Sequence, residues 1–318
     1  MTQQTAQSRL DVKVGLIGEK ASGKTNLFMD LPFALDNGLH GYPLSWSLKI
    51  QPANSATRLK VKDYRRSDPE VGTSRLVEGQ YRLHHPAIRH SDETGALSKD
   101  PTVTTEFELQ DAPGETQFPT NSGGNPFPDQ RDSQNDWLRD AGALIITLPA
   151  FRLFDPGALT SILDYLSRIE ADRLRGLKRV VVAITMFDLL MFRFRDRALE
   201  LAAIPSFVRE ILKVAISDDT LDHLKYFEID HLTGVDIRFI AVSSWGFIPN
   251  YGCSNLDPNG VKPDGAEFGQ RFVDVTSRKD DPKSAKRFPY MAADPMIYAI
   301  TGFEHRFFFR LEQLTDGV

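Results

Sequence analysis

An eight-residue stretch near the N-terminus, Gly18–Thr25, constrains the fold more than any other part of the chain. It reads Gly-Glu-Lys-Ala-Ser-Gly-Lys-Thr and matches G-x-x-x-x-G-K-[ST], the pattern of loops that bind nucleotide phosphates. Residues 13–17 before it are largely apolar and predict a strand, whereas residues 26–35 after it are mostly helix formers. Small residues let backbone N–H groups approach a phosphate, and a helix start adds a positive dipole end. We therefore expect a strand, a phosphate-binding loop and a helix in this order.

The side chains of this loop suggest separate roles. Lys24 is expected to reach the β- and γ-phosphates, and the Thr25 hydroxyl is expected to ligate Mg²⁺. The residues predicted to contact the nucleotide in this part of the chain are Gly18, Lys20, Ala21, Ser22, Gly23, Lys24, Thr25 and Asn26.

Composition narrows the class of protein. The chain has 318 residues, of which 41% are hydrophobic and 25% charged, as in ordinary globular proteins. A net charge of -5 gives no indication of a nucleic acid or an anionic membrane as partner. The single cysteine, Cys253, cannot form an internal disulfide, and the apolar runs are too short or too charged to span a bilayer. We expect a cytoplasmic protein with neither nucleic-acid nor membrane partners.

Apolar patterns alternate between strand and helix along the chain, which predicts an α/β fold. We expect a doubly wound, mostly parallel sheet with helices on both faces. The expected strands are 13–17, 44–50, 75–84, 103–109, 143–148, 179–185 and 236–243, and the last helix is expected over 293–314. Residues 1–10 are expected to be a disordered lead, and 11–318 one domain with insertions at about 36–100, 117–132, 189–233 and 246–290.

A second motif, Asp111-Ala112-Pro113-Gly114, stands at the end of the alternating strand 103–109. A carboxylate here can hold Mg²⁺ through water, and the Gly114 N–H can meet a γ-phosphate. The next residue, Glu115, is the candidate that orients an attacking water. The pattern D-x-P-G is also ordinary turn chemistry, so its position after a phosphate-binding loop gives it meaning.

Two further motifs follow the next predicted strands. Thr185-Met186-Phe187-Asp188 comes directly after one strand, and Ser243-Ser244-Trp245 comes after another. Ligands of doubly wound sheets lie at the carboxyl ends of the strands. Asp188 is placed to accept hydrogen bonds from guanine N1 and N2, and backbone N–H groups near Ser244 can donate to O6. The residues predicted to contact the base side of the nucleotide are Thr185, Phe187, Asp188, Ser243, Ser244 and Trp245.

With these four motifs in order, the chain resembles a Ras-like P-loop GTPase of the translation-factor-related class, over about 12–244 and the last helix. It departs from that family at Met186, where the third motif usually has lysine, and at Glu115, where Ras has glutamine. The Asp111–Glu115 motif, the long insertions and the late Asp294-Pro295 helix also resemble bacterial double-GTPase proteins of conflict or defence operons.

This resemblance implies binding of GTP or GDP with Mg²⁺, slow GTP hydrolysis and a switch between nucleotide states. It also implies a protein partner, either an effector or an activating protein. A switch I threonine should ligate Mg²⁺. Thr73 is that residue if 75–84 is the second strand, whereas a second strand at 44–50 would put the switch in 36–43, which contains no threonine.

Two other functions remain open at this point. Glu115 and the long segment rich in proline and glycine after it also fit a GTP-binding scaffold with little hydrolysis, and Met186 leaves an ATP-using P-loop protein open. Other groups are expected to be structural. We expect the histidines at 84, 85 and 90 to lie in a solvated loop, the basic run 58–66 to be a solvated face, and 307–309 to pack in the core.

Overall fold

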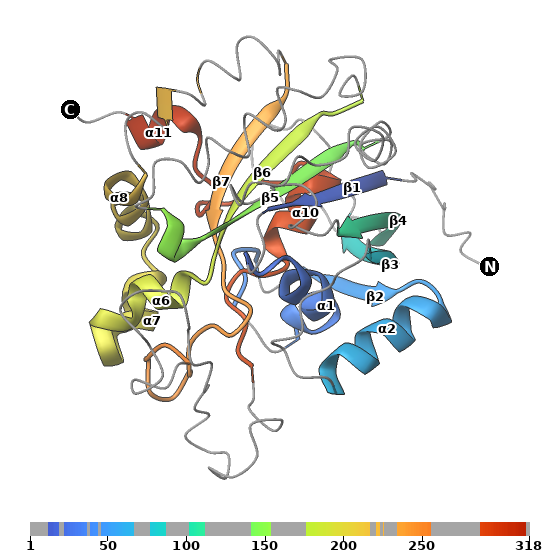
Figure 1. The fold of residues 1–318 in the computed structure, drawn as a ribbon, viewed down its shortest axis with the longest axis horizontal. Helices are drawn as coiled ribbons and strands as arrows, with labels where there is room; N and C mark the ends of the chain where they lie inside the picture. Colours follow the sequence, from blue (N-terminus) through green and yellow to red (C-terminus); the bar gives the residue numbers. More distant parts are fainter. Residues whose placement is uncertain are drawn as a thin grey trace, which may run out of the picture.

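The computed structural model describes residues 12–18, 22–36, 39–43, 46–66, 77–86, 102–111, 141–153, 176–216, 221–222, 225, 234–255 and 287–315. The strands are β1 (Val12–Ile17), β2 (Lys49–Pro52), β3 (Val77–Pro86), β4 (Thr102–Asp111), β5 (Ala143–Pro149), β6 (Arg179–Thr185) and β7 (Asp236–Ala241). The α-helices are α1 (Lys24–Ala34), α2 (Ser55–Arg66), α6 (Phe187–Met191), α7 (Ala198–Ala202), α8 (Pro205–Ala215), α10 (Asp294–Thr301) and α11 (Leu311–Thr315). Short 3₁₀ helices η2 (Ala150–Arg152) and η4 (Phe192–Arg197) complete the described elements (Figure 1).

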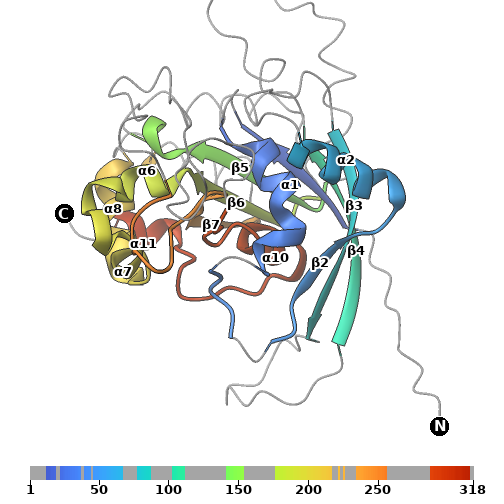
Figure 2. The ribbon, with the colours of Figure 1, turned by 90° about the horizontal axis from the view of Figure 1, so that it is seen from below.

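The described strands form one mixed, seven-stranded sheet in the order β2-β3-β4-β1-β5-β6-β7. Strands β4, β1, β5, β6 and β7 run parallel, and β3 is antiparallel to both β2 and β4. The α/β class and the mostly parallel sheet are therefore confirmed, while the antiparallel edge was not expected. The sheet is strongly twisted: in Figure 2 the strands β3 and β4 run in a clearly different direction from β5 and β6.

The centre of the sheet is the apolar core. All seven residues of β5 are buried, because β1 and β6 flank this strand and α10 packs against it. In β6 the run Val180–Ile184 is buried as well, which agrees with the continuous apolar pattern of a covered parallel strand. Helix α1 packs against β2 and β4, so the segment after the predicted phosphate loop also joins the core.

Two expectations for the antiparallel edge are wrong. Of the described residues 46–50 in the alternating segment, only Lys49 and Ile50 belong to a strand, β2, and residues 46–48 precede it. His84 lies in β3, in agreement with the strand expected over 75–84 and not with a solvated loop. His85 also belongs to β3 and is buried, with its Nε2 hydrogen-bonded to Thr105 Oγ1 at 3.0 Å. Pairing of β3 with β4 over ten residues on each strand overrides the polar local composition. His90 lies outside the described residues.

The expected helix over 293–314 is instead two short helices joined by an extended segment. Helix α10 ends at Thr301, with Gly302 as its C-cap, and Phe309 then forms an antiparallel bridge with Phe239 of β7, with both N–H···O distances at 2.9 Å. This pairing covers the edge of β7, which a continuous helix would leave open. The three phenylalanines of 307–309 are all buried, so their role in core packing is confirmed.

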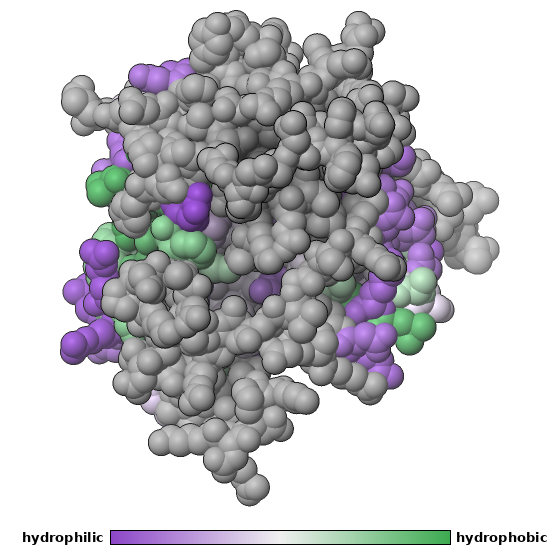
Figure 3. All heavy atoms as spheres, viewed as in Figure 1, coloured by the Kyte–Doolittle hydropathy of each residue, from purple (hydrophilic) through white to green (hydrophobic). Residues whose placement is uncertain are grey.

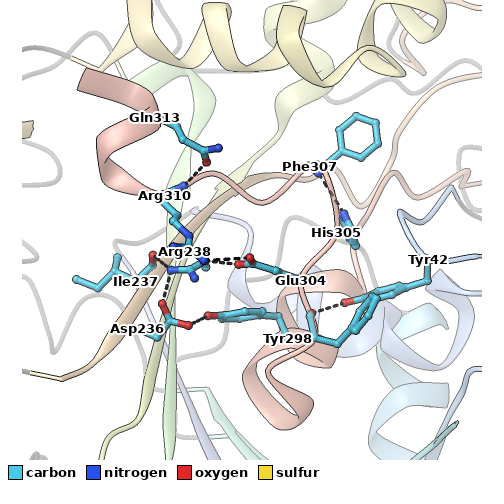
Figure 4. A network of polar contacts seen from close by, with 11 residues as sticks. Tyr42, Asp236, Ile237, Arg238, Tyr298, Glu304, His305, Phe307, Arg310 and Gln313 are labelled. Carbon is cyan, nitrogen blue, oxygen red and sulfur yellow. Dashed lines mark hydrogen bonds and ion pairs between the residues drawn. The ribbon is translucent and has the colours of Figure 1, made fainter. Parts of the chain in front are cut away.

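A polar network holds this C-terminal segment in place (Figure 4). The guanidinium of Arg238 lies between Asp236 and Glu304, bonding Glu304 at 2.5 Å, and the Tyr298 hydroxyl donates to Asp236. His305 Nε2 bonds Asp294 at 2.6 Å. The network lies where β7 begins, and the last helices are thereby tied to the sheet.

The basic run 58–66 lies on helix α2 and forms a solvated face, as the sequence predicts. Arg58, Lys60 and Lys62 are exposed, and hydrophilic residues gather over this helix in Figure 3. None of the helices in the described ranges has the length and apolarity needed to cross a bilayer.

Candidate functional site

The predicted site segments meet at one edge of the sheet. Strand β1 lies between β4 and β5, so the chain order reverses at β1, and ligands of such sheets bind beyond the carboxyl ends of the strands at this point. Residues 18–25 follow β1 directly. Asp111 ends β4 and is in register with Leu16 of β1, while Thr185 ends the parallel strand β6.

Both glycines of the predicted phosphate loop are required by its geometry. A Cβ on Gly18 would lie 2.2 Å from Thr147 Oγ1 and 2.7 Å from the Thr147 carbonyl oxygen, so a larger residue cannot fit there. Gly23, the residue that precedes α1, has φ 84. This left-handed backbone conformation is strained for any residue that carries a Cβ atom. The backbone at Gly18 is therefore in close contact with β5, and at Gly23 the chain turns sharply into the helix.

Lys24 reaches back across the loop. Its ammonium donates to the Gly18 carbonyl oxygen at 2.6 Å, and the side chain is only 6% exposed. Ser22 Oγ bonds Thr147 Oγ1 at 2.7 Å, and Thr147 Oγ1 donates to the Ile17 carbonyl oxygen at 3.1 Å. A buried cation is stable where it meets oxygen atoms or anions, so this loop suits a negatively charged ligand.

The phosphate loop contacts the end of β6 directly. Thr185 Oγ1 donates to the Ser22 carbonyl oxygen at 2.6 Å, in a buried hydrogen bond that joins residues far apart in the chain. A Cβ on Gly23 would lie 3.5 Å from Thr185 Cβ and 3.8 Å from Met186 Cε, so the Met186 side chain lies close to the loop. The first and third motifs of the sequence therefore share one site.

Asp188 is the second residue of helix α6, close to this contact, and is only 2% exposed. Ser243 Oγ donates to Asp188 Oδ1 at 2.5 Å, and Ser254 Oγ donates to the Asp188 carbonyl oxygen at 2.7 Å. Burial raises the pKa of the Asp188 carboxyl from its ordinary value of 3.8 to about 6, outweighing the opposing effects of Ser243 and of its own backbone N–H. Burial thus disfavours the ionised form of Asp188, and additional hydrogen-bond donors to this carboxylate would stabilise that form.

The fourth motif, Ser243-Ser244-Trp245, forms a turn in which backbone N–H groups point to the Ser243 hydroxyl. The N–H groups of Trp245 and Gly246 donate to Ser243 Oγ at 3.2 and 2.8 Å. Ser243 therefore orients the carboxylate and closes its own turn with one hydroxyl group. Within the described part of the chain the Ser244 N–H has no hydrogen-bond acceptor, so it is the amide of this turn left for a ligand.

Two of the three predicted metal ligands, Thr25 and Asp111, lie in described elements beside the phosphate loop predicted from the sequence. Thr25 is the second residue of α1, and Asp111 is the last residue of β4, the strand beside β1. Hydroxyl and carboxylate oxygens are donors that Mg²⁺ prefers, and Mg²⁺ sites often use few protein ligands because phosphates and water complete the shell. Among the described residues, no group of three or more His, Cys, Asp or Glu side chains forms a metal site.

Several predicted residues fall outside the described ranges or have a different role. Lys20, Ala21, Thr73, Gly114 and Glu115 lie outside the described residues, as does the expected disordered lead at 1–10. Asn26 lies in the first turn of α1. Phe187 is fully buried and stacks on Tyr290 with ring centroids 5.9 Å apart, so its ring is part of the core and only its backbone borders the site.

The structure also adds residues that sequence patterns did not indicate. Thr147 interrupts the apolar run of β5, and this polar interruption is the one signal in the sequence that pointed to it. Ser254, Asp30 and Arg287 have no such signal, because each acts through a partner distant in sequence.

The chain matches no protein-family model and no curated protein.

Proposed function

We propose that this chain binds guanine nucleotides with Mg²⁺, hydrolyses GTP slowly and acts as a switch between nucleotide states. The contact between the phosphate loop and the end of β6 carries the proposal. Through the Thr185 hydrogen bond to Ser22, a lysine suited to phosphates and a buried carboxylate suited to a base belong to one site. This combination fits a nucleotide better than it fits an isolated phosphate or a purine.

The preference for guanine follows from Asp188 and Ser244. An ionised carboxylate accepts hydrogen bonds from guanine N1–H and N2–H, and a backbone N–H donates to O6. Adenine offers the opposite pattern, so it would leave the buried Asp188 carboxylate without donors. The raised pKa of Asp188 in the free protein agrees with a carboxylate that lacks such donors.

Phosphate binding is assigned to Lys24 and the loop backbone, with Thr25 and Asp111 as the candidate Mg²⁺ ligands. Thr73 is the further candidate from the sequence. Mg²⁺ would supply positive charge to the phosphate oxygens. The chain itself contributes the Lys24 ammonium and the N-terminal end of α1, which stabilise negative charge on the transferring group.

Hydrolysis is proposed from the sequence, with the Gly114 N–H at the γ-phosphate and Glu115 orienting the water. A glutamate there places negative charge near the γ-phosphate, and we therefore expect slow turnover unless a partner supplies a cation. The partner would be an effector or activating protein. In the bacterial operons that the sequence resemblance indicates, that role would belong to conflict or defence.

Calorimetric binding of GDP, ADP and GTP with Mg²⁺ tests the base assignment. GDP should bind at least about tenfold more tightly than ADP, which corresponds to about 1.4 kcal/mol. Asp188→Asn should weaken GTP and favour xanthosine triphosphate, whereas Asp63→Asn, at an exposed position of α2, should change neither. Equal affinities for GDP and ADP would refute the guanine assignment and favour the ATP-using alternative.

Single-turnover phosphate release tests the enzymatic part separately. Wild type should release phosphate from labelled GTP, and Glu115→Ala should slow this release without a matching loss of GTP affinity. Lys24→Ala should abolish binding of triphosphates, with Lys62→Ala as the control for the loss of an exposed lysine. Tight GTP binding without any phosphate release would leave the scaffold function.

A further inference from the structure

Residues 287–291 run alongside the turn of the fourth motif, which we call the base loop (Ser243–Gly246). Ser243 and Tyr290 exchange both backbone hydrogen bonds, at 2.9 and 2.8 Å, and the Phe288 N–H donates to the Trp245 carbonyl oxygen at 3.0 Å. Residues 287–291 therefore hold the base loop along one side, although they follow it by about forty positions in the sequence. Arg287 is the first described residue of that segment.

The Arg287 side chain joins the base loop to the phosphate helix α1. Its guanidinium carbon lies 4.2 Å from the centroid of the Trp245 ring, and Arg287 Nη1 bonds Asp30 Oδ2 at 2.5 Å. Asp30 lies on α1, six residues after Lys24, and its side chain is 1% exposed. One guanidinium thus contacts an aromatic ring of the base loop and a buried carboxylate of the phosphate helix.

Few side chains other than arginine can make both of these interactions at once. Arginine is well suited to both, because the planar guanidinium can stack on an indole while its N–H groups bond a carboxylate. The contact is mostly buried, so solvent screens it little, and loss of Arg287 would leave the Asp30 carboxylate without this cation. Trp245 directly follows Ser244, and a displaced Trp245 would therefore move the Ser244 N–H.

We propose that Arg287 is a positioning residue that determines base specificity in the guanine site. It holds the base loop at a fixed distance from the phosphate helix, so that the Ser244 N–H meets O6 while the phosphates occupy the loop at Lys24. This inference rests on the proposed function, because it assigns Arg287 to that same nucleotide site. Loss of Arg287 should reduce discrimination between bases and leave phosphate affinity nearly unchanged.

Binding of GDP, ADP and inorganic pyrophosphate, each with Mg²⁺, tests the inference on the full chain. Arg287→Ala should weaken GDP about tenfold or more and change ADP and pyrophosphate by less than about twofold. Arg287→Lys should recover part of the GDP affinity, because lysine keeps the charge toward Asp30 but stacks less well on Trp245. Arg58→Ala, at an exposed arginine of α2, is the matched control and should change none of the three affinities.

A second variant removes the risk that the buried Asp30 carboxylate, once it has lost the Arg287 cation, unfolds the protein. Asp30→Asn combined with Arg287→Met removes both charges together, and thermal unfolding of this variant should stay cooperative while the GDP-to-ADP ratio falls. If wild type prefers GDP, and both Arg287→Ala and the double variant with Asp30→Asn and Arg287→Met retain that preference in full, the inference is wrong and the proposed function stands. If wild type binds GDP and ADP equally, the proposed function fails and the inference fails with it.

Discussion

Asp188→Asn should make the nucleotide-free protein more stable at neutral pH. The Asp188 carboxyl is 2% exposed, and burial is the main cause of its raised pKa. Ionised Asp188 is therefore unfavourable in the folded state. Asparagine has nearly the same shape and no charge, and its side-chain oxygen can still accept the Ser243 hydrogen bond. The substitution removes a charge that the fold is predicted to keep for its ligand.

The pKa gives the size of this effect. A shift from 3.8 to about 6 corresponds to an unfavourable contribution of ~3 kcal/mol when the carboxyl is ionised. This net value already includes the hydrogen bond from Ser243, which favours the ionised carboxyl and lowers its pKa. We therefore expect a stabilisation of ~3 kcal/mol, larger than the ~0.5–2 kcal/mol that single favourable substitutions commonly give.

The sign of the pH dependence follows from the folded-state pKa being the higher one. The folded state binds the Asp188 proton more tightly than the unfolded state, so the penalty is full above about pH 6 and disappears as the pH falls toward 3.8. The advantage of Asp188→Asn over wild type should be largest at about pH 8, fall by about half near pH 5, and be nearly absent at about pH 3. Other carboxyl groups titrate equally in both proteins and cancel in the difference.

Urea unfolding without nucleotide, followed at these pH values, measures this difference. The transition midpoint of Asp188→Asn should lie above that of wild type at about pH 8, with an unchanged slope. Asp63→Asn, on the exposed surface of α2, should match wild type at each pH value. A destabilised Asp188→Asn at about pH 8, or an advantage that persists at low pH, would refute the reasoning.

Two further substitutions separate the site from the rest of the fold. Thr185→Val keeps the side-chain volume but removes the donor to the Ser22 carbonyl oxygen, so stability should fall by ~1–2 kcal/mol. Calorimetry should show GDP and ADP weakened to the same extent, and a loss confined to GDP would contradict a phosphate-loop role. Arg238→Met leaves Asp236 and Glu304 without their shared cation; because these carboxylates are 47% and 41% exposed, we expect a loss of only ~1–2 kcal/mol in urea unfolding. GDP affinity of that variant should equal wild type, and a large change would show that the network in Figure 4 acts on the site.

Sequence reasoning predicted well the parts that local patterns determine. The bounds of β6 match the expected 179–185, because a continuous β-branched run is typical of a strand covered on both faces. The order of strand, glycine loop and helix around Gly23 also agrees with the structure, since the motif is contiguous in the chain.

Contacts between distant residues account for what the sequence did not predict. Ser22 and Thr147 are 125 residues apart, and Arg287 and Asp30 are 257 residues apart, so no local pattern indicates either pair. The helix expected over 293–314 fails for the same reason, because Phe309 pairs with Phe239 of β7 and helical periodicity does not report this competing partner. Local propensity is a weak guide where tertiary pairing satisfies the backbone.

The turn after β6 combines two local free-energy costs, and their coincidence supports a ligand site there. Met186 has φ 55, a left-handed conformation that is uncommon for a non-glycine residue, and Asp188 two residues later is a buried carboxylate. Backbone hydrogen bonds hold this turn: Phe187 N–H donates to the Val242 carbonyl oxygen at 3.1 Å, and Leu189 N–H donates to that of Met186 at 2.9 Å. The strained turn brings Met186 close to Gly23 and leaves Asp188 against Ser243. A fold under selection for stability alone would relax the turn and neutralise the carboxylate, so both features agree with the proposal that a base with two N–H donors binds there.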